Sequence, residues 1–309
     1  MIRLPGTTWG SAAPTPERGA RREGEDTPHF MSAHHKHRPW RRPVLAVVAA
    51  AAVAVPASAF ATGAPADASP SGGGTAPTAE ALDDSYYEGA VGKTGDELKT
   101  ALHSIISRQT KLSYDEVWDA LQTTDEDPDN TGNVILLYSG RSQAKAAHGS
   151  GADDWNREHV WAKSHGDFGT ATGPGTDIHH LRPEDASVNA TRGNLDFDNG
   201  GDPVEEAPGS KADGDSFEPR DAVKGDVARM ILYMAVRYDG SDGFPDLEPN
   251  DRVGNGSAPF MGSLTALRQW NDADPPDAFE KARNERIFGI QKNRNPFVDH
   301  PEWVAAIWK

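Results

Sequence analysis

Apolar residues recur at helical spacing in several parts of the chain. In the stretch 94–108, the apolar residues Leu98, Leu102, Ile105 and Ile106 lie one, three or four positions apart. A helix with this pattern presents one apolar face to a protein core. The same spacing predicts further helices at 114–123, 224–238, 264–270 and 278–288. Helices are therefore expected to make up most of the folded chain.

Short apolar runs predict a few strands between these helices. The run 134–138 (VILLY) has the length and the β-branched residues of a buried strand, and 158–161 (EHVW) is a second, shorter candidate. Pro183 is favoured in the first turn of a helix, and the acidic Glu184 and Asp185 suit that end of the helix dipole, so a helix is predicted to begin there. The pattern as a whole predicts an α+β fold, mixed and rich in helix.

The N-terminal part of the chain has the pattern of a targeting segment. Residues 34–43 are basic, 44–55 form an uninterrupted apolar run of twelve, and 57–59 (ASA) match a small-x-small cleavage pattern. These three parts are typical of a secretory signal peptide. A run of twelve is too short to cross a bilayer, which takes about 20 residues. We therefore expect a secreted protein.

The same region sets the expected domain boundaries. Met31 stands directly before the basic residues and is expected to be the true start, which would make residues 1–30 an extension assigned in error. The signal peptide is then 31–59. Residues 60–82, rich in Ala, Pro, Gly, Ser and Thr, are expected to form a disordered linker. One folded domain is expected from 83 to 309.

Composition and charge narrow the chemistry. The 309 residues include no cysteine, which excludes a disulfide scaffold, a thiolate zinc site and a cysteine nucleophile. The formal net charge is -16, and because eight basic and four acidic residues precede Phe60, the remainder carries -20. Such a protein does not hold nucleic acid by bulk positive charge. If it acts on a phosphate, it must neutralise that phosphate locally.

The segment 156–194 concentrates side chains that bind metals, accept protons or contact phosphate. It contains four of the chain's eleven histidines together with arginines, acids and amides: Arg157, Glu158, His159, His165, Asp177, His179, His180, Arg182, Asn189, Arg192 and Asn194. Histidine is a common general base and a frequent metal ligand, and arginine donors suit phosphate. Glu and neutral His without Cys are compatible with Mg²⁺, Mn²⁺ or Zn²⁺. The segment therefore indicates a metal or phosphate site.

A base, a divalent ion and arginines together suit phosphodiester hydrolysis, in which the base activates water and the metal neutralises the phosphate. The chain contains neither the HExxH motif of zinc proteases nor the GxSxG elbow of serine hydrolases. Glu158 and His159 would point to opposite faces in the middle of a strand. At a strand end or bend, both could approach one site.

Motifs in this segment closely resemble the bacterial endonuclease I family, which belongs to the His-Me finger, or ββα-metal, nucleases. They are NREHVW at 156–161, KSHG at 163–166 and DIHHLRPEDASVNATRGN at 177–194. The resemblance also covers 87–107 and 291–303. It implies a secreted or periplasmic endonuclease that cuts DNA, RNA or both with little sequence preference, and a ββα finger set among helices.

The resemblance also implies a base and metal ligands. His159 matches the general base of the family, and the preceding Glu158 matches a metal ligand. The second ligand is expected just before the Leu-x-Pro, where many relatives have Asn and this chain has His180. His179 and Asp177 remain alternatives for that ligand. One divalent metal ion is expected, in the first place Mg²⁺, with Mn²⁺, Ca²⁺ and Zn²⁺ as alternatives.

Two arginines are candidates for contact with phosphate. Arg192 is the first choice and Arg157 the second, although both could instead form salt bridges that tie the finger to neighbouring helices. Asn189 and Asn194 are expected to fix loops by hydrogen bonds to the backbone. The implied reaction is an attack by water that His159 activates, leaving 5′-phosphate and 3′-hydroxyl ends.

Two other classes of protein fit part of this pattern. In a non-catalytic nucleic-acid or metal-binding module, the histidines would form a structural metal site, but such a copy would tend to lose the Glu158-His159 pair. A phosphodiesterase for small substrates would not cut a closed circular plasmid, which has no ends. The expected partners are DNA and/or RNA, with no membrane span in the mature protein and a monomer as the default state.

Overall fold

The computed structural model describes residues 84–309. The expected extension (1–30), signal peptide (31–59) and linker (60–82) lie outside the described residues. Within 84–309, no helix is long and apolar enough to cross a membrane.

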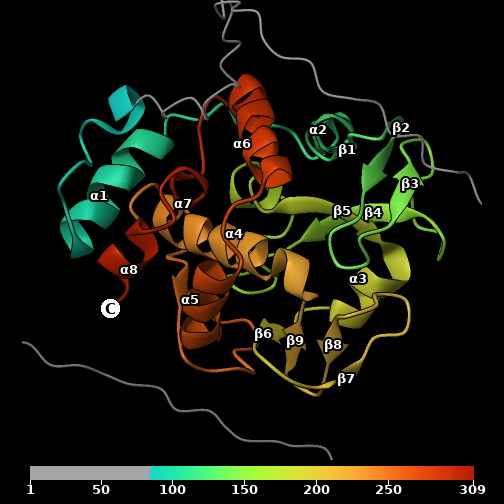
Figure 1. Ribbon diagram of the computed structural model, residues 1–309. Coiled ribbons are helices and arrows are strands. Elements are labelled where there is room, and N and C mark those ends of the chain that lie inside the picture. Colours follow the sequence, from blue (N-terminus) through green and yellow to red (C-terminus); the bar gives the residue numbers. More distant parts are fainter. Residues whose placement is uncertain (1–83) are drawn as a thin grey trace, which may run out of the picture. The chain divides into compact units, whose positions relative to one another are not determined.

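Helix α4 (Lys224–Arg237) lies at the centre of the larger of two hydrophobic cores (Figure 1). Helices α1 (Gly95–Ile106), α5 (Leu264–Ala273) and α7 (Pro296–Asp299) pack against it, and α8 (Trp303–Ile307) packs against α1 and α5. All residues of α4 except Lys224 are buried. A helix that is buried all round is enclosed by its neighbours, so α4 holds the helical half of the domain together.

A second, smaller core lies between α2 (Glu116–Thr124), α6 (Ala278–Gln291) and the strands around them. A three-stranded sheet borders this core in the order β1 (Glu126–Asp127), β2 (Asn130–Ile135) and β3 (Ser142–Ala144). Its strand β2 begins earlier than the predicted run 134–138, because Asp127 and Asn130 pair across a tight turn. Leu136, Leu137 and Tyr138 continue the run as buried residues outside the strand.

The motif segment folds as two antiparallel strands followed at once by a helix. β4 (Trp155–His159) pairs with β5 (Leu181–Asp185), so that His159 lies opposite Leu181, and α3 (Ala186–Arg192) follows directly (Figure 1). The prediction that a helix begins at Pro183 is wrong, since Pro183 and Glu184 lie in β5. The helix begins later because the Asp185 side chain is its N-cap.

The remaining elements are short. A four-stranded sheet has the order β6 (Asp196–Phe197), β9 (Ser216–Glu218), β8 (Lys211–Ala212) and β7 (Asp202–Pro203). Strand β10 (Glu248–Pro249) pairs with β11 (Phe260–Met261), and the 3₁₀ helices are η1 (Asp84–Tyr87), η2 (Pro174–Thr176) and η3 (Asp221–Val223). The predicted α+β class is confirmed, but helices make up less than half of the described residues rather than most of them. The five helices predicted from apolar spacing lie within a few residues of their predicted bounds.

Candidate active site

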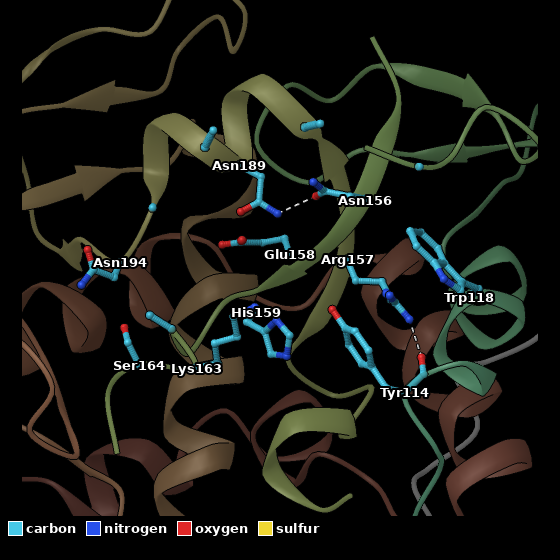
Figure 2. A pocket seen from close by; sticks show the side chains of 15 residues that line it. Tyr114, Trp118, Asn156, Arg157, Glu158, His159, Lys163, Ser164, Asn189 and Asn194 are labelled. Atoms are coloured by element: carbon cyan, nitrogen blue, oxygen red, sulfur yellow. Dashed lines mark hydrogen bonds between the residues drawn. The ribbon is translucent and has the colours of Figure 1, made fainter. Parts of the chain in front are cut away.

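A cavity of about 440 Å³ opens where β4 ends against α3 (Figure 2). Arg157, Glu158 and His159 reach it from the end of β4, and Asn189 reaches it from α3. Both members of the Glu158-His159 pair line the same cavity, as expected for a pair at a strand end.

Glu158 presents one carboxylate oxygen to the protein. Its Oε1 accepts a hydrogen bond from the Tyr138 hydroxyl at 2.7 Å and lies 3.1 Å from Arg192 Nη1. Burial raises the pKa of Glu158, while the charge of Arg192 and the hydrogen bond from Tyr138 oppose this. Because both contacts are made by Oε1, Oε2 is the oxygen left to serve a ligand in the cavity.

His159 is oriented by a backbone carbonyl. Its Nε2 lies 3.1 Å from the carbonyl oxygen of Gly175 in η2. A carbonyl can only accept, so Nε2 carries the proton of the neutral ring and Nδ1 keeps a free lone pair. Burial lowers the pKa of His159 well below its usual value, and the neighbouring His180 acts in the same direction. The neutral, proton-accepting form is therefore the stable one near neutral pH.

The loop that supplies this carbonyl depends on glycine. A Cβ on Gly175 would lie 2.7 Å from the carbonyl oxygen of Gly169 and 2.8 Å from backbone atoms of Thr170. Gly173 has a φ of +122°, and a Cβ there would lie 2.5 Å from the Phe244 ring. The Gly-rich stretch identified in the sequence is thus packed tightly enough to hold the Gly175 carbonyl against His159.

Asn189 lines the cavity, whereas the sequence analysis assigned it only a structural role. Its Nδ2 donates to Asn156 Oδ1 at 2.6 Å, which directs Asn189 Oδ1 toward Glu158 in the cavity (Figure 2). The expectation that Asn189 hydrogen-bonds to backbone is wrong, because its partner is the Asn156 side chain. Asp185 is a sequence signal for this position, because Asp is favoured as the N-cap of a helix. A helix that begins after Asp185 places Asn189 one turn into it, beside β4.

The structure does not support His180 as the second metal ligand. His180 is fully buried and does not line the cavity. Its Nε2 lies 2.7 Å from the Pro174 carbonyl oxygen, and its Nδ1 accepts a hydrogen bond from the Trp161 amide at 3.3 Å. Both ring nitrogens are occupied, so no lone pair is left for a metal.

The two alternatives for that ligand are also used inside the protein. His179 Nε2 lies 3.2 Å from Asn293 Oδ1, and its ring packs on Tyr233 with centroids 4.3 Å apart. The buried Asp177 carboxylate accepts hydrogen bonds from the side chains of four residues, namely Gln109, Tyr233, Tyr238 and Gln291. Neither residue lines the cavity.

The structure does not place Arg192 at the cavity where a phosphate contact is expected. The Arg192 side chain is fully buried, with Nη1 donating to the His159 carbonyl at 2.8 Å and Nη2 donating to the Val160 carbonyl at 2.6 Å. Together with its ion pair to Glu158, these bonds fix the end of β4. The alternative weighed for Arg192, a structural ion pair, describes it better.

Arg157 does line the cavity. Its guanidinium carbon lies 3.4 Å from the ring centre of Tyr114 and 4.0 Å from that of Trp118, and Nη1 donates to the Tyr114 carbonyl. Aromatic rings at these distances attract the guanidinium and limit its motion. Arg157 is therefore a half-exposed cation held at one side of the site.

The donor set around the cavity fits a hard divalent ion. Glu158 offers a carboxylate oxygen and Asn189 an amide oxygen, both of which Mg²⁺ accepts. Within the described chain, no three His, Asp or Glu side chains are placed to share an ion. Mg²⁺ is often bound through one or two protein ligands plus water and substrate phosphate, so the two oxygens suffice for such a site.

Buried side chains held at fixed positions around an open cavity, with a neutral histidine among them, are the features of a hydrolytic active site. Residues 94–302 match the family model described as Endonuclease I, and the chain belongs to this family of nucleases.

Curated relatives agree with the family. The chain is 63% identical over 247 residues to an extracellular ribonuclease of Bacillus subtilis, covering 78% of this chain and 86% of the relative. It is 64% identical over 232 residues to an extracellular ribonuclease of Bacillus amyloliquefaciens, covering 75% and 80%. An extracellular deoxyribonuclease of Aeromonas hydrophila is 29% identical over 128 residues, covering 40% and 49%. The expectation of a secreted nuclease is confirmed.

Proposed function

We propose that this protein is a secreted, metal-dependent endonuclease that hydrolyses RNA, and DNA as well, with little sequence preference. The observation that carries the proposal is the convergence of Glu158, neutral His159 and Asn189 on one cavity. The strand–strand–helix order of β4, β5 and α3 is also the order of a ββα finger, which supports assignment to the His-Me finger nucleases.

The preference for RNA rests on the relatives. The two that are 63% and 64% identical are named ribonucleases, whereas the deoxyribonuclease is 29% identical over a shorter match. Identity above 60% over three quarters of the chain favours a shared substrate, and the more distant relative makes DNA the second substrate to test.

A divalent ion, Mg²⁺ in the first place, would be held by Glu158 Oε2 and Asn189 Oδ1. When bound, it would supply positive charge to the phosphate and to the leaving oxygen. Because both donors are oxygens, Mg²⁺, Mn²⁺ and Ca²⁺ are favoured over Zn²⁺.

In the proposed reaction, His159 Nδ1 takes a proton from the water that attacks phosphorus. The new bond joins the water oxygen to phosphorus, and the bond from phosphorus to the 3′ oxygen breaks. The 3′ oxygen then takes up a proton, which leaves a 3′-hydroxyl and a 5′-phosphate end. Arg157 contacts a substrate phosphate beside the reacting one, while Arg192 acts only by holding Glu158 and the end of β4.

Plasmid nicking and RNA digestion test this function directly. The purified protein is incubated with supercoiled plasmid or structured RNA in the presence of Mg²⁺, Mn²⁺, Ca²⁺ or EDTA, beside His159→Ala. We expect metal-dependent cleavage of both substrates, faster on RNA, and loss of cleavage in the variant. New ends should accept labelled phosphate from a kinase only after phosphatase treatment, as 5′-phosphate ends do.

Absence of cleavage with every metal would reject the nuclease and favour the binding module. Cleavage that survives EDTA would reject the metal. Retention of full activity in His159→Ala would reject the assigned base.

A further inference from the structure

Lys163 lies in the turn after β4, four residues beyond His159, and lines the same cavity. The cavity lining contains two cations, Arg157 and Lys163, and one carboxylate, Glu158. This local excess of positive charge stands against the formal net charge of -16 on the whole chain. An acidic nuclease needs such a local excess to bind a polyanion.

The environment of Lys163 differs from that of several other lysines. Lys99, Lys145, Lys211 and Lys224 each form an ion pair with a carboxylate. Lys163 is exposed, and no ion pair joins it to any residue of 84–309. A cation that is not neutralised by the protein, beside a site for phosphate chemistry, is available to a phosphate of the substrate.

The charge of Lys163 also acts on the reacting groups. Burial raises the pKa of Glu158 and lowers the pKa of His159, and the charge of Lys163 lowers both, which opposes the first shift and adds to the second. A cation that influences both groups lies close enough to contact a nucleotide bound there.

Lys163 and Arg157 stand on different sides of the catalytic groups. In Figure 2, Lys163 and Ser164 lie on one side of His159, and Tyr114, Arg157 and Trp118 lie on the other. A nucleic-acid strand that places one phosphate beside Glu158 and His159 therefore extends toward a cation in either direction.

We infer that Lys163 binds the backbone phosphate next to the scissile one, on the side opposite Arg157. The inference rests on the proposed nuclease function and defines its substrate class more narrowly. The preferred substrate is a strand that carries a phosphate on both sides of the cleaved bond, and a dinucleoside monophosphate, which has no neighbouring phosphate, is a poor substrate.

Three dinucleotides with one cleavable bond test the inference. They are NpN, its 5′-phosphorylated form pNpN and its 3′-phosphorylated form NpNp, where N is any nucleoside. For the unaltered protein, at least one terminal phosphate should raise kcat/KM by about tenfold, the effect of one charged hydrogen bond. In Lys163→Gln one of these gains should fall to about twofold or less, and Lys163→Arg should retain it.

A matched control is Lys281→Gln, which removes the same charge from an exposed position on α6 outside the cavity. Lys281→Gln should keep any increase in kcat/KM that a terminal phosphate causes in the unaltered protein. On single-stranded RNA, the slope of log kcat/KM against log salt should become shallower by about 0.7 in Lys163→Gln and stay unchanged in the control, because each phosphate contact on a single strand contributes about that amount.

Two results would overturn the inference while leaving the nuclease assignment intact. One is that neither terminal phosphate accelerates cleavage by the unaltered protein. The other is that Lys163→Gln slows all three dinucleotides by the same factor and leaves the salt slope unchanged, which would show that Lys163 does not contact a neighbouring phosphate. Failure of the proposed function itself would instead appear as no cleavage of long RNA or plasmid by the unaltered protein.

Discussion

Two pairs of adjacent residues lie at neighbouring ends of the paired strands β4 and β5 and have opposite environments. The first pair, Glu158-His159, ends β4. The second pair, His179-His180, comes directly before β5, whose first residue, Leu181, lies opposite His159. The first pair lines an open cavity, and the second is enclosed by protein on all sides.

Hydrogen bonding of the imidazole nitrogens separates the two pairs. His159 uses Nε2 on the Gly175 carbonyl and keeps Nδ1 free, whereas His180 uses Nε2 on the Pro174 carbonyl and Nδ1 on the Trp161 amide. One short loop supplies both carbonyls. A neutral histidine here can accept a proton or bind a metal only where the fold leaves one ring nitrogen without a protein partner.

The largest expected effect that tests this comparison is on catalysis. His159→Ala should lower kcat by about a hundredfold to ten-thousandfold, because it removes the proton acceptor, with little change in metal affinity. His180→Gln should instead lower the melting temperature and reduce the rate per folded molecule far less. Steady-state kinetics, Mn²⁺ titration and thermal unfolding of both variants measure this. Loss of metal binding in His180→Gln alone would restore His180 as a ligand.

The next largest effect is expected at Arg192, which carries the buried ion pair of the first region. Arg192→Met should reduce the free energy of unfolding by about 3–5 kcal/mol, because Glu158 is left buried without its cation. Urea unfolding measures this loss. Arg192→Lys keeps the charge but offers one donor group to two carbonyls. Its free energy of unfolding should therefore fall by less than that of Arg192→Met.

Wild-type stability of Arg192→Met combined with a raised KM would identify Arg192 as a phosphate contact after all. Arg157→Met is the matched control, since its half-exposed side chain has no ion pair to a buried carboxylate within the described region.

A pH effect on stability should follow from the second region. Burial lowers the pKa of His179 from 6.5 to about 4. Between these values the unfolded chain binds a proton that the folded chain does not, so stability is complete above pH 6.5 and falls as the pH falls toward 4. The loss from this group is at most about 3 kcal/mol. Urea unfolding at pH 7 and pH 5 measures it.

His179→Gln should show a smaller difference between the two pH values than the unaltered protein, because glutamine does not titrate. Equal pH dependence in both proteins would show that His179 does not contribute.

The smallest expected effect concerns the metal. Asn189→Ala should weaken Mg²⁺ or Mn²⁺ binding by about tenfold or more, because one of the two proposed protein ligands is lost. Isothermal titration with the unaltered protein and with Asn194→Ala, which changes another amide at the cavity, provides the comparison. Unchanged affinity in Asn189→Ala would reject Asn189 as a ligand.

Much of the site could be predicted because it depends on local motifs. The motif 156–161 places Glu158 and His159 next to each other, and a strand end lets both reach one cavity. The resemblance places the second ligand just before the Leu-x-Pro, at His180, whereas the structure places Asn189 of α3 at the cavity. Pro183 fits the first turn of a helix and also fits a short strand, and local propensity does not distinguish the two. The pairing of β5 with β4 places Pro183 in a strand.

The amino-acid sequence alone determined the α+β class, the positions of the helices with regular apolar spacing and the segment that holds the motifs, since all of these follow from periodicity and short motifs. Only the tertiary structure decided which side chains reach the cavity. Asn189 faces it because Asp185 caps α3, His180 is excluded because two backbone groups occupy its ring, and Arg192 is buried because Glu158 needs a counterion. Apart from the Asp185 cap, these outcomes depend on contacts between residues 6 to 34 positions apart, which no local pattern encodes.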